Sequence, residues 1–253
     1  MKSLNYSRWA VMARRLALWW MALALLAIAG VAQAQSQAVG TVTHLSGLLT
    51  ARHADGTRTV LAVKSAILQG DTLITERGTY TRVQFLDDAE IVLRPGSEVV
   101  VAKYVYDEKK PENDSVAINL VKGGLRAVTG LVGKRNHEAV NFDTPTATIG
   151  IRGTNFGALF CQNDCGAVPT TNGTPPQNGL HVDVTQGAIV LTNPGGTQLF
   201  QAGQFGFTPS LRVPPIIVPV SPGIKFTPPP SFSTPVSPSQ QSTSGQTVDC
   251  VVR

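Results

Sequence analysis

The sequence predicts an all-β fold, either an irregular β-solenoid or another layered β-strand domain, with a β-sandwich as the alternative architecture. Three observations lead to this prediction. Short runs of about five to ten residues are rich in Val, Ile, Thr, Leu and aromatic residues. Turn-forming pairs such as Asp-Gly, Gly-Asp, Arg-Gly and Pro-Gly separate these runs. After residue 35, no stretch of about eleven residues or more shows a helical period of apolar residues.

The expected strands follow one another from residue 39 to residue 203. In chain order they span 39–45, 47–53, 57–63, 71–75, 79–86, 90–94, 97–106, 116–123, 124–130, 139–144, 147–154, 156–161, 180–187, 188–192 and 197–203. A similar form, an apolar residue followed by Gly and a strand, recurs around Gly47, Gly124 and Gly187. The unequal spacing of these glycines excludes a regular repeat and favours strands that wrap in irregular layers.

Residues 1–34 have the pattern of a secretory signal peptide. Residues 1–15 carry basic residues and no acidic ones, 16–31 form an apolar core, and Ala32-Gln33-Ala34 is a small-residue exit. An uncleaved membrane anchor is the alternative, but the core is shorter than the ~20 residues of a membrane span. We therefore expect a periplasmic or secreted protein with no transmembrane segment after signal cleavage.

The basic charge of the chain belongs mostly to this leader. It holds four of the 21 Lys and Arg residues and none of the 16 acidic residues, which leaves 17 basic against 16 acidic residues. A nearly neutral mature chain gives no reason to expect nucleic acid or anionic lipid as a partner.

Two segments inside the predicted domain (39–208) and one after it have the composition of loops or tails. Residues 107–115 are charged and predict a solvated hairpin loop, and 163–179 are rich in turn residues. Residues 209–253 are rich in Pro, Ser and Thr and predict a disordered tail, in which "VPPIIVPV" is apolar enough to pack against the domain or a partner.

The three cysteines lie beyond the leader, in a compartment where disulfides form. Cys161 and Cys165 are separated by three residues that suit a short turn, so we expect a small-loop disulfide between them. Pairing of Cys250 with one of them is the alternative. Zinc is not expected, because a second cysteine pair and histidines at ligand spacing are missing.

Several motifs together resemble those of FecR domains. They are "LQGDTLIT", "TRVQFLDDAEIVLRPGSEVVV", "LVKGGLRAVTG" and "FDTPTATIGIRGTNF", in this order, and the resemblance covers about 39–207. The fold-signature residues are Thr144 and Pro145 of the Thr-Pro-x-Ala run, followed by Arg152, Gly153 and Thr154. The resemblance implies an exported all-β module of the kind that relays signals from an outer-membrane transporter. In this chain an export leader stands where signalling members carry a cytoplasmic segment and a membrane helix.

Arg152 interrupts an otherwise apolar run and is expected to be a buried structural clamp. A buried arginine needs partners, and Asp71 and Asp143 are the candidates. The alternative is a contact with a ligand or partner. The family's Asp-Gly-Ser turn is replaced by Asp87-Asp88-Ala89, where Asp tolerates the left-handed conformation. We expect a solvated turn there, with a calcium site as the alternative.

The sequence offers no persuasive catalytic set, cofactor site or metal site, and predicts a non-enzymatic protein. Its four histidines are scattered, and G-x-S-x-G is missing. The leading hypothesis is an exported FecR-like binding or scaffold module of the cell envelope, with an envelope or outer-membrane protein as partner. The alternative is a cell-wall glycan-binding protein, although all three tryptophans lie in the leader. The third possibility is an enzyme on a β scaffold.

Overall fold

The computed structural model describes residues 37–168, 170, 173–218 and 223–226. The predicted leader, Cys250 and most of the predicted tail lie outside these residues. In the described part of the chain, no helix is long and apolar enough to cross a membrane.

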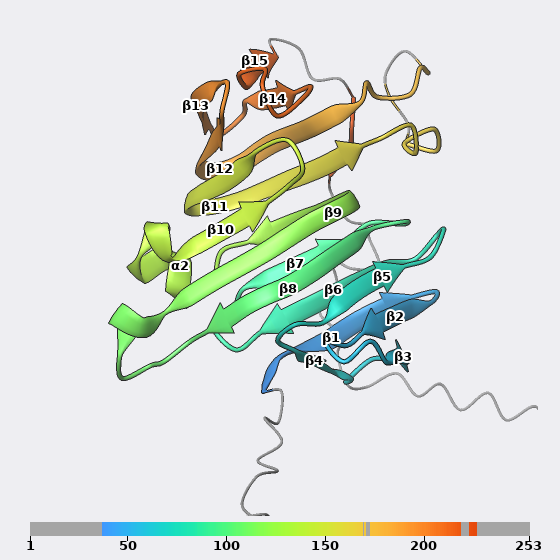
Figure 1. The fold of residues 1–253 in the computed structure, drawn as a ribbon, viewed down its shortest axis with the longest axis vertical. Coiled ribbons are helices and arrows are strands. Elements are labelled where there is room, and N and C mark those ends of the chain that lie inside the picture. Colours follow the sequence, from blue (N-terminus) through green and yellow to red (C-terminus); the bar gives the residue numbers. More distant parts are fainter. Residues whose placement is uncertain (1–36, 169, 171–172, 219–222, 227–253) are drawn as a thin grey trace, which may run out of the picture. The chain divides into compact units, whose positions relative to one another are not determined.

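The strands form one large, open, mixed sheet that is folded into two layers (Figure 1). The first layer contains β4 (Ala66–Leu68), β1 (Ala38–Ser46), β6 (Tyr80–Phe85), β7 (Glu90–Leu93), β14 (Phe205–Thr208) and β15 (Ile216–Val218). The second contains β3 (Arg58–Leu61), β2 (Leu49–Arg52), β5 (Thr72–Thr75), β8 (Glu98–Val105), β10 (Val140–Asp143) and β13 (Gly196–Gln201). Three long strands run through both layers: β9 (Ser115–Val128), β11 (Thr148–Cys161) and β12 (Gly179–Asn193). Short helical turns are η1 (Pro111–Asn113), α2 (Leu131–Arg135) and η2 (His137–Ala139).

The main hydrophobic core lies between the two layers. Alternating residues along the strands are buried, as a sheet with one covered face requires. Two aromatic pairs join the layers: Phe85 of β6 stacks on Tyr104 of β8 at 4.5 Å, and Phe142 of β10 meets Phe156 of β11 edge to face at 5.1 Å. The predicted all-β, layered fold class is confirmed. The layers are not separate sheets of a sandwich, because β9, β11 and β12 belong to both.

Each long strand changes layer at a glycine with positive φ. Residues 115–122 of β9 pair with β8 and residues 123–128 with β11, and Gly123 at the change has φ 72°. The corresponding glycines are Gly153 of β11 (φ 61°) and Gly187 of β12 (φ 77°). A side chain is disfavoured at such angles, so glycine allows the sharp bend without steric cost.

Side-chain hydroxyl groups fasten these bends to the neighbouring strands. Ser97 Oγ accepts a hydrogen bond from the Gly124 N–H and donates one to the Gly124 carbonyl, both at 2.8 Å. Thr129 Oγ1 does the same for Thr154, with distances of 3.0 Å to N and 2.8 Å to O. Each hydroxyl thus satisfies one backbone N–H at the bend and adds a second donor to a carbonyl that also accepts a backbone N–H.

The ordered domain continues beyond the boundary predicted at residue 208. β15 pairs with β14, and Ile224 and Phe226 are buried against the outer face of the first layer. The apolar run "VPPIIVPV" therefore supplies an edge strand of the sheet. Its composition, rich in proline, hid a strand of only three residues.

We expect alanine at the two facing bends to have graded effects. In Gly153→Ala the new Cβ has space but a left-handed backbone, at a cost of about 1–2 kcal/mol. In Gly187→Ala the Cβ would lie 2.3 Å from the Gly153 carbonyl oxygen, and the loss should reach about 3 kcal/mol or more. Urea unfolding of both variants measures this order. Gly166→Ala, where a Cβ meets nothing within 4 Å, is the control. Equal losses at Gly153 and Gly187 would contradict the proposed packing of the bends.

Candidate functional site: the hollow around Arg152

The fold-signature residues form two distinct local structures. Thr144 and Pro145 begin the turn between β10 and β11, which Thr144 Oγ1 closes by donating to the Ala147 carbonyl at 2.7 Å and accepting from its N–H at 3.1 Å. Gly153 and Thr154 form the bend of β11, a bulge in which two residues oppose the single Gly187 of β12. These four residues shape the backbone.

Arg152 is not the buried clamp expected from the sequence. Its side chain is exposed on the outer face of the second layer, because its neighbour Ile151 points into the core and side chains alternate along a strand. Asp71 is instead bound to His53 Nδ1 at 2.6 Å, and Asp143 to Thr148 Oγ1 at 2.7 Å. Among the described residues, no carboxylate lies within ion-pair distance of the Arg152 guanidinium.

Arg152 lines an open hollow of about 450 Å³. The floor consists of Asn141, Gly150 and Val190, which lie side by side on β10, β11 and β12. Gly150 leaves the floor low, since a Cβ there would meet only the Val190 carbonyl at 3.8 Å. The wall is formed by 135–138 of the α2–η2 segment together with Arg152. We call this feature the Arg152 hollow.

The wall of the hollow is fixed by a buried carboxylate from another part of the chain. Asp87, which is 2% exposed, accepts a hydrogen bond from Val132 N through Oδ2 (3.1 Å), and its carbonyl accepts one from Leu131 N (2.7 Å). Asp87 thereby caps the first turn of α2, whose own N-cap is a glycine without a side-chain bond. The sequence pattern indicated a solvated turn here, which is wrong for Asp87. Asp88 does adopt the left-handed conformation expected for this turn (φ 63°).

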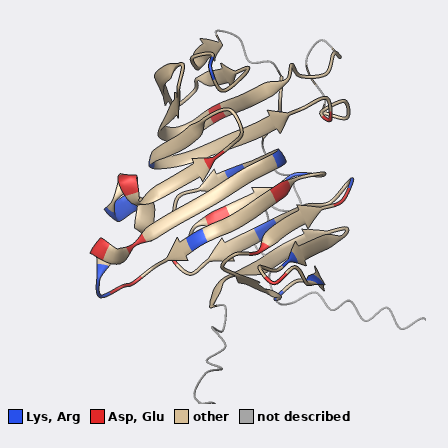
Figure 2. Ribbon diagram, viewed as in Figure 1, with Lys and Arg blue, Asp and Glu red and all other residues tan. Residues whose placement is uncertain are grey.

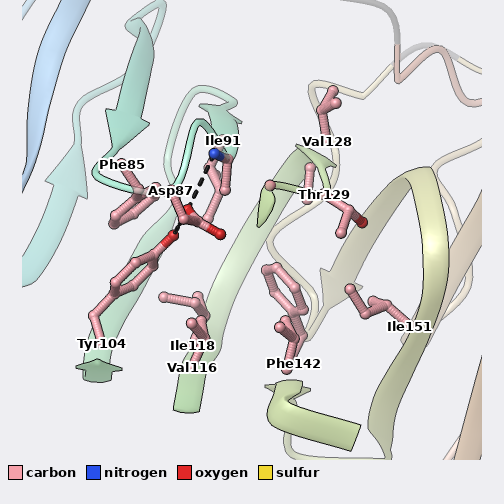
Figure 3. Close-up of a pocket in the computed structure, with 14 residues that line it drawn as sticks. Phe85, Asp87, Ile91, Tyr104, Val116, Ile118, Val128, Thr129, Phe142 and Ile151 are labelled. Carbon is pink, nitrogen blue, oxygen red and sulfur yellow. Dashed lines mark hydrogen bonds between the residues drawn. The ribbon is translucent and has the colours of Figure 1, made fainter. Parts of the chain in front are cut away.

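Tyr104 completes the surroundings of Asp87. Its hydroxyl donates to Asp87 Oδ1, and Figure 3 shows the two side chains pointing toward one another beside apolar residues of both layers. Burial, and then the charge of Asp87, raise the pKa of the Tyr104 hydroxyl far above its usual value, so it stays a donor. The apolar void at this place has a volume of about 20 Å³, which is room for about one water molecule and for no larger ligand.

The charges around the hollow differ in how firmly they are held. Arg135 lies 3.7 Å from the buried Asp114 carboxylate and 5.3 Å above the Tyr106 ring. His137 and Glu138 are exposed on the wall, and Figure 2 shows basic and acidic residues gathered on the α2 segment. Arg152 differs from Arg135: its backbone is fixed by the adjoining bend, and its guanidinium has no carboxylate partner among the described residues. Such a guanidinium can bind a carboxylate through two parallel hydrogen bonds.

One further group of side chains has the order of a hydrolase triad. His53 contacts Asp71 through Nδ1 (2.6 Å) and Thr59 Oγ1 through Nε2 (3.0 Å). Sequence reasoning missed this arrangement, because the three residues come from separate strands and turns. Thr59 is exposed on the edge strand β3 and lines neither the Arg152 hollow nor the apolar void beside Tyr104. A hydrolase would need a substrate pocket and oxyanion donors beside the hydroxyl.

The structure places the two described cysteines together, at the end of β11 and in the short loop that follows it. Cys161 and Cys165 form a disulfide with an S–S distance of 2.04 Å. No three His, Cys, Asp or Glu residues of the described ranges gather so as to hold a metal ion, and this includes the turn at Asp87.

We expect adjacent aspartates to respond differently to loss of charge. In Asp87→Asn an amide N–H₂ replaces one of two acceptor oxygens and faces a buried donor, at a cost of about 1–3 kcal/mol. Asp88→Asn keeps a residue that tolerates positive φ and is exposed, so the change should stay within about 0.5 kcal/mol. Chemical unfolding of both variants measures the difference. Similar stability of the two would show that Asp87 does not anchor α2.

Comparison with solved structures gives distant similarities. A protein described as a cell surface anchoring domain has 27% identity and a TM-score of 0.24, over 24% of this chain and 82% of that chain. Two crystal structures of a candidate anti-sigma factor from Parabacteroides distasonis, at 1.65 and 2.50 Å, have 13% identity and TM-scores of 0.42 and 0.43. Each of these two alignments covers 58% of both chains.

By sequence, this chain matches one protein family and no curated protein. The family described as FecR protein matches residues 71–190, a range that contains the Asp87 turn, the bends of β9, β11 and β12 and the whole Arg152 hollow. Residues 71–190 of this chain therefore match the FecR family, in agreement with the resemblance noted in the sequence.

Proposed function

We propose that this protein is an exported, non-catalytic FecR-like module of the cell envelope that binds a partner protein through the Arg152 hollow. The main support for this proposal is the exposure of Arg152. The bend at Gly153 and Thr154 fixes its backbone, yet its guanidinium faces solvent without a carboxylate partner among the described residues. An arginine that acted as a buried structural clamp would be paired with an acceptor, and Arg152 is not buried.

The partner chemistry follows from the hollow. An exposed guanidinium beside Asn141 and a low glycine floor suits an acidic side chain or a chain-terminal carboxylate. The leader pattern and the disulfide support an oxidising compartment outside the cytoplasm. The FecR family supports a signalling or regulatory role carried out by protein contacts.

A site-specific crosslinking experiment tests the binding surface. A photo-crosslinking amino acid replaces Glu138 on the wall of the hollow, and the tagged full chain is irradiated in intact cell envelopes. We expect one reproducible protein adduct, lost in Arg152→Glu, reduced in Arg152→Ala and partly retained in Arg152→Lys. All three variants should unfold within about 0.5 kcal/mol of the parent, because Arg152 is exposed.

The control places the same photoprobe at Val60, which is 66% exposed on β3 at the other end of the sheet. Equal adducts from both positions, or adducts that survive Arg152→Glu, would overturn the proposal. Capture of cell-wall glycan in place of protein would favour the glycan-binding alternative.

The absence of catalysis can be checked at the triad-like group. We expect hydrolysis of p-nitrophenyl acetate by the full chain to equal that of its His53→Ala variant, because Thr59 lies on an exposed edge strand and lines neither the Arg152 hollow nor the apolar void. A rate that falls to background only in His53→Ala and in Thr59→Val would instead establish a hydrolase.

A further inference from the structure

A second apolar cluster lies on the outer face of the first layer, separate from the main core. It consists of Leu159, Cys161, Cys165, Ile224 and Phe226, with Val168 packed against it. Residues 223–226, here called the strap, reach this cluster from beyond β15. The strap therefore packs against β11, a strand that precedes it by many residues in the sequence. It lies on the opposite layer from the Arg152 hollow.

The strap occupies a seat whose shape fits it closely. Ile224 is 4% exposed and Phe226 is 7% exposed. A Cβ at Gly157 would lie 2.2 Å from Phe226 Cγ, so the absence of a side chain at 157 makes the slot for the ring. A glycine at an outward position of a strand commonly marks such a close approach.

Arg94 holds the strap by its backbone and its ring. One guanidinium nitrogen donates to the Lys225 carbonyl at 2.8 Å, and the guanidinium lies 5.7 Å from the centre of the Phe226 ring. Asp183 steadies the other side of the seat, because its carboxylate accepts the Gly157 N–H at 2.9 Å. The strap is therefore held by burial of two apolar side chains and by a hydrogen bond from Arg94 to its backbone, which does not depend on the side chain of residue 225.

The disulfide forms a wall of the same seat. Cys161 is the last residue of β11, and its side chain is 1% exposed, while Cys165 is 5% exposed. Both half-cystines belong to the cluster that buries Ile224 and Phe226. The sulfurs are therefore shielded in part by the strap, and the strap packs on a loop that the disulfide closes.

We propose that the strap and the Cys161–Cys165 disulfide form a releasable latch for the C-terminal part of the chain. The docked strap hinders attack on the disulfide by thiolates, and reduction of the disulfide loosens the seat and releases the strap. Since coupling between two equilibria is reciprocal, each state stabilises the other. Release uncovers Gly157, Leu159 and Arg94 as an apolar groove with one cation.

The reducing agent is a dithiol. Its thiolate attacks one cystine sulfur and forms a mixed disulfide, and the second cysteine leaves as a thiolate. The remaining thiol of the reductant then displaces the first cysteine and closes its own disulfide. Two electrons pass from the dithiol to the cystine, and the two cysteine thiolates take up the two protons that the dithiol loses.

The rate of reduction tests the shielding. Full-length oxidised protein is treated with dithiothreitol, and free thiols are counted over time after alkylation. We expect Phe226→Ala to be reduced on the order of tenfold faster than the parent, because its disulfide is exposed more of the time. Ile217→Ala, which removes an apolar side chain that is 42% exposed on β15, should react like the parent. Equal rates in Phe226→Ala and the parent would overturn the shielding.

Trypsin tests the reverse direction. Cleavage after Lys225 in the strap is compared with cleavage after the exposed Arg212, which serves as an internal reference in the same chain. We expect the ratio of Lys225 to Arg212 cleavage to rise on the order of tenfold in the Cys161→Ser/Cys165→Ser variant and in Phe226→Ala. The thermal unfolding midpoint confirms that each variant is folded. An unchanged ratio in the double-serine variant would show that the disulfide does not latch the strap.

Discussion

The rest of the structure depends on a backbone constraint, the bend by which β11 passes from one layer to the other against the bend of β12. At this place the Gly153 carbonyl oxygen lies 2.3 Å from where a Cβ of residue 187 would be, and both glycines have positive φ, so both positions favour glycine. Comparable bends at Gly123 and at the chain's other layer changes let one continuous sheet cover both faces of its own core. The hydroxyls of Ser97 and Thr129 accept hydrogen bonds from the backbone N–H groups of Gly124 and Thr154 beside the bends.

This constraint explains how much of the fold could be predicted. The sequence pattern divided β9, β11 and β12 each into two shorter strands, and the divisions fall directly after Gly123 and Gly187 and, in β11, at Asn155 close to Gly153. Each prediction was locally right, because the bend interrupts the alternation of side chains. The continuity of each strand through its bend could not be predicted, since it depends on hydrogen bonds to distant strands. Strand β15 could not be predicted either, because it has only three residues and lies in a segment rich in proline.

The candidate site was predicted in part. The Arg-Gly-Thr motif lies at the bend of β11 and beside the hollow, but Arg152 is exposed and is not the expected buried clamp, because composition does not tell which face of a strand is covered. Asp87 was missed as the anchor of α2, since its partners Val132 and Tyr104 come from other elements. The bend thus does two things: it fixes the fold through Gly153 and Thr154, and it presents Arg152 to solvent. In the proposed function, Gly153 and Thr154 serve stability, and the neighbouring Arg152 serves recognition.

The most direct test of this dependence is native-state hydrogen exchange across both layers of the full chain. Because β9, β11 and β12 belong to both layers, the slowest amides of β6 in the first layer and of β8 in the second should exchange with the same free energy of opening and the same denaturant dependence. Two distinct opening energies, one for each layer, would show that the layers unfold separately. The shared strands would then not be the constraint on which the fold depends.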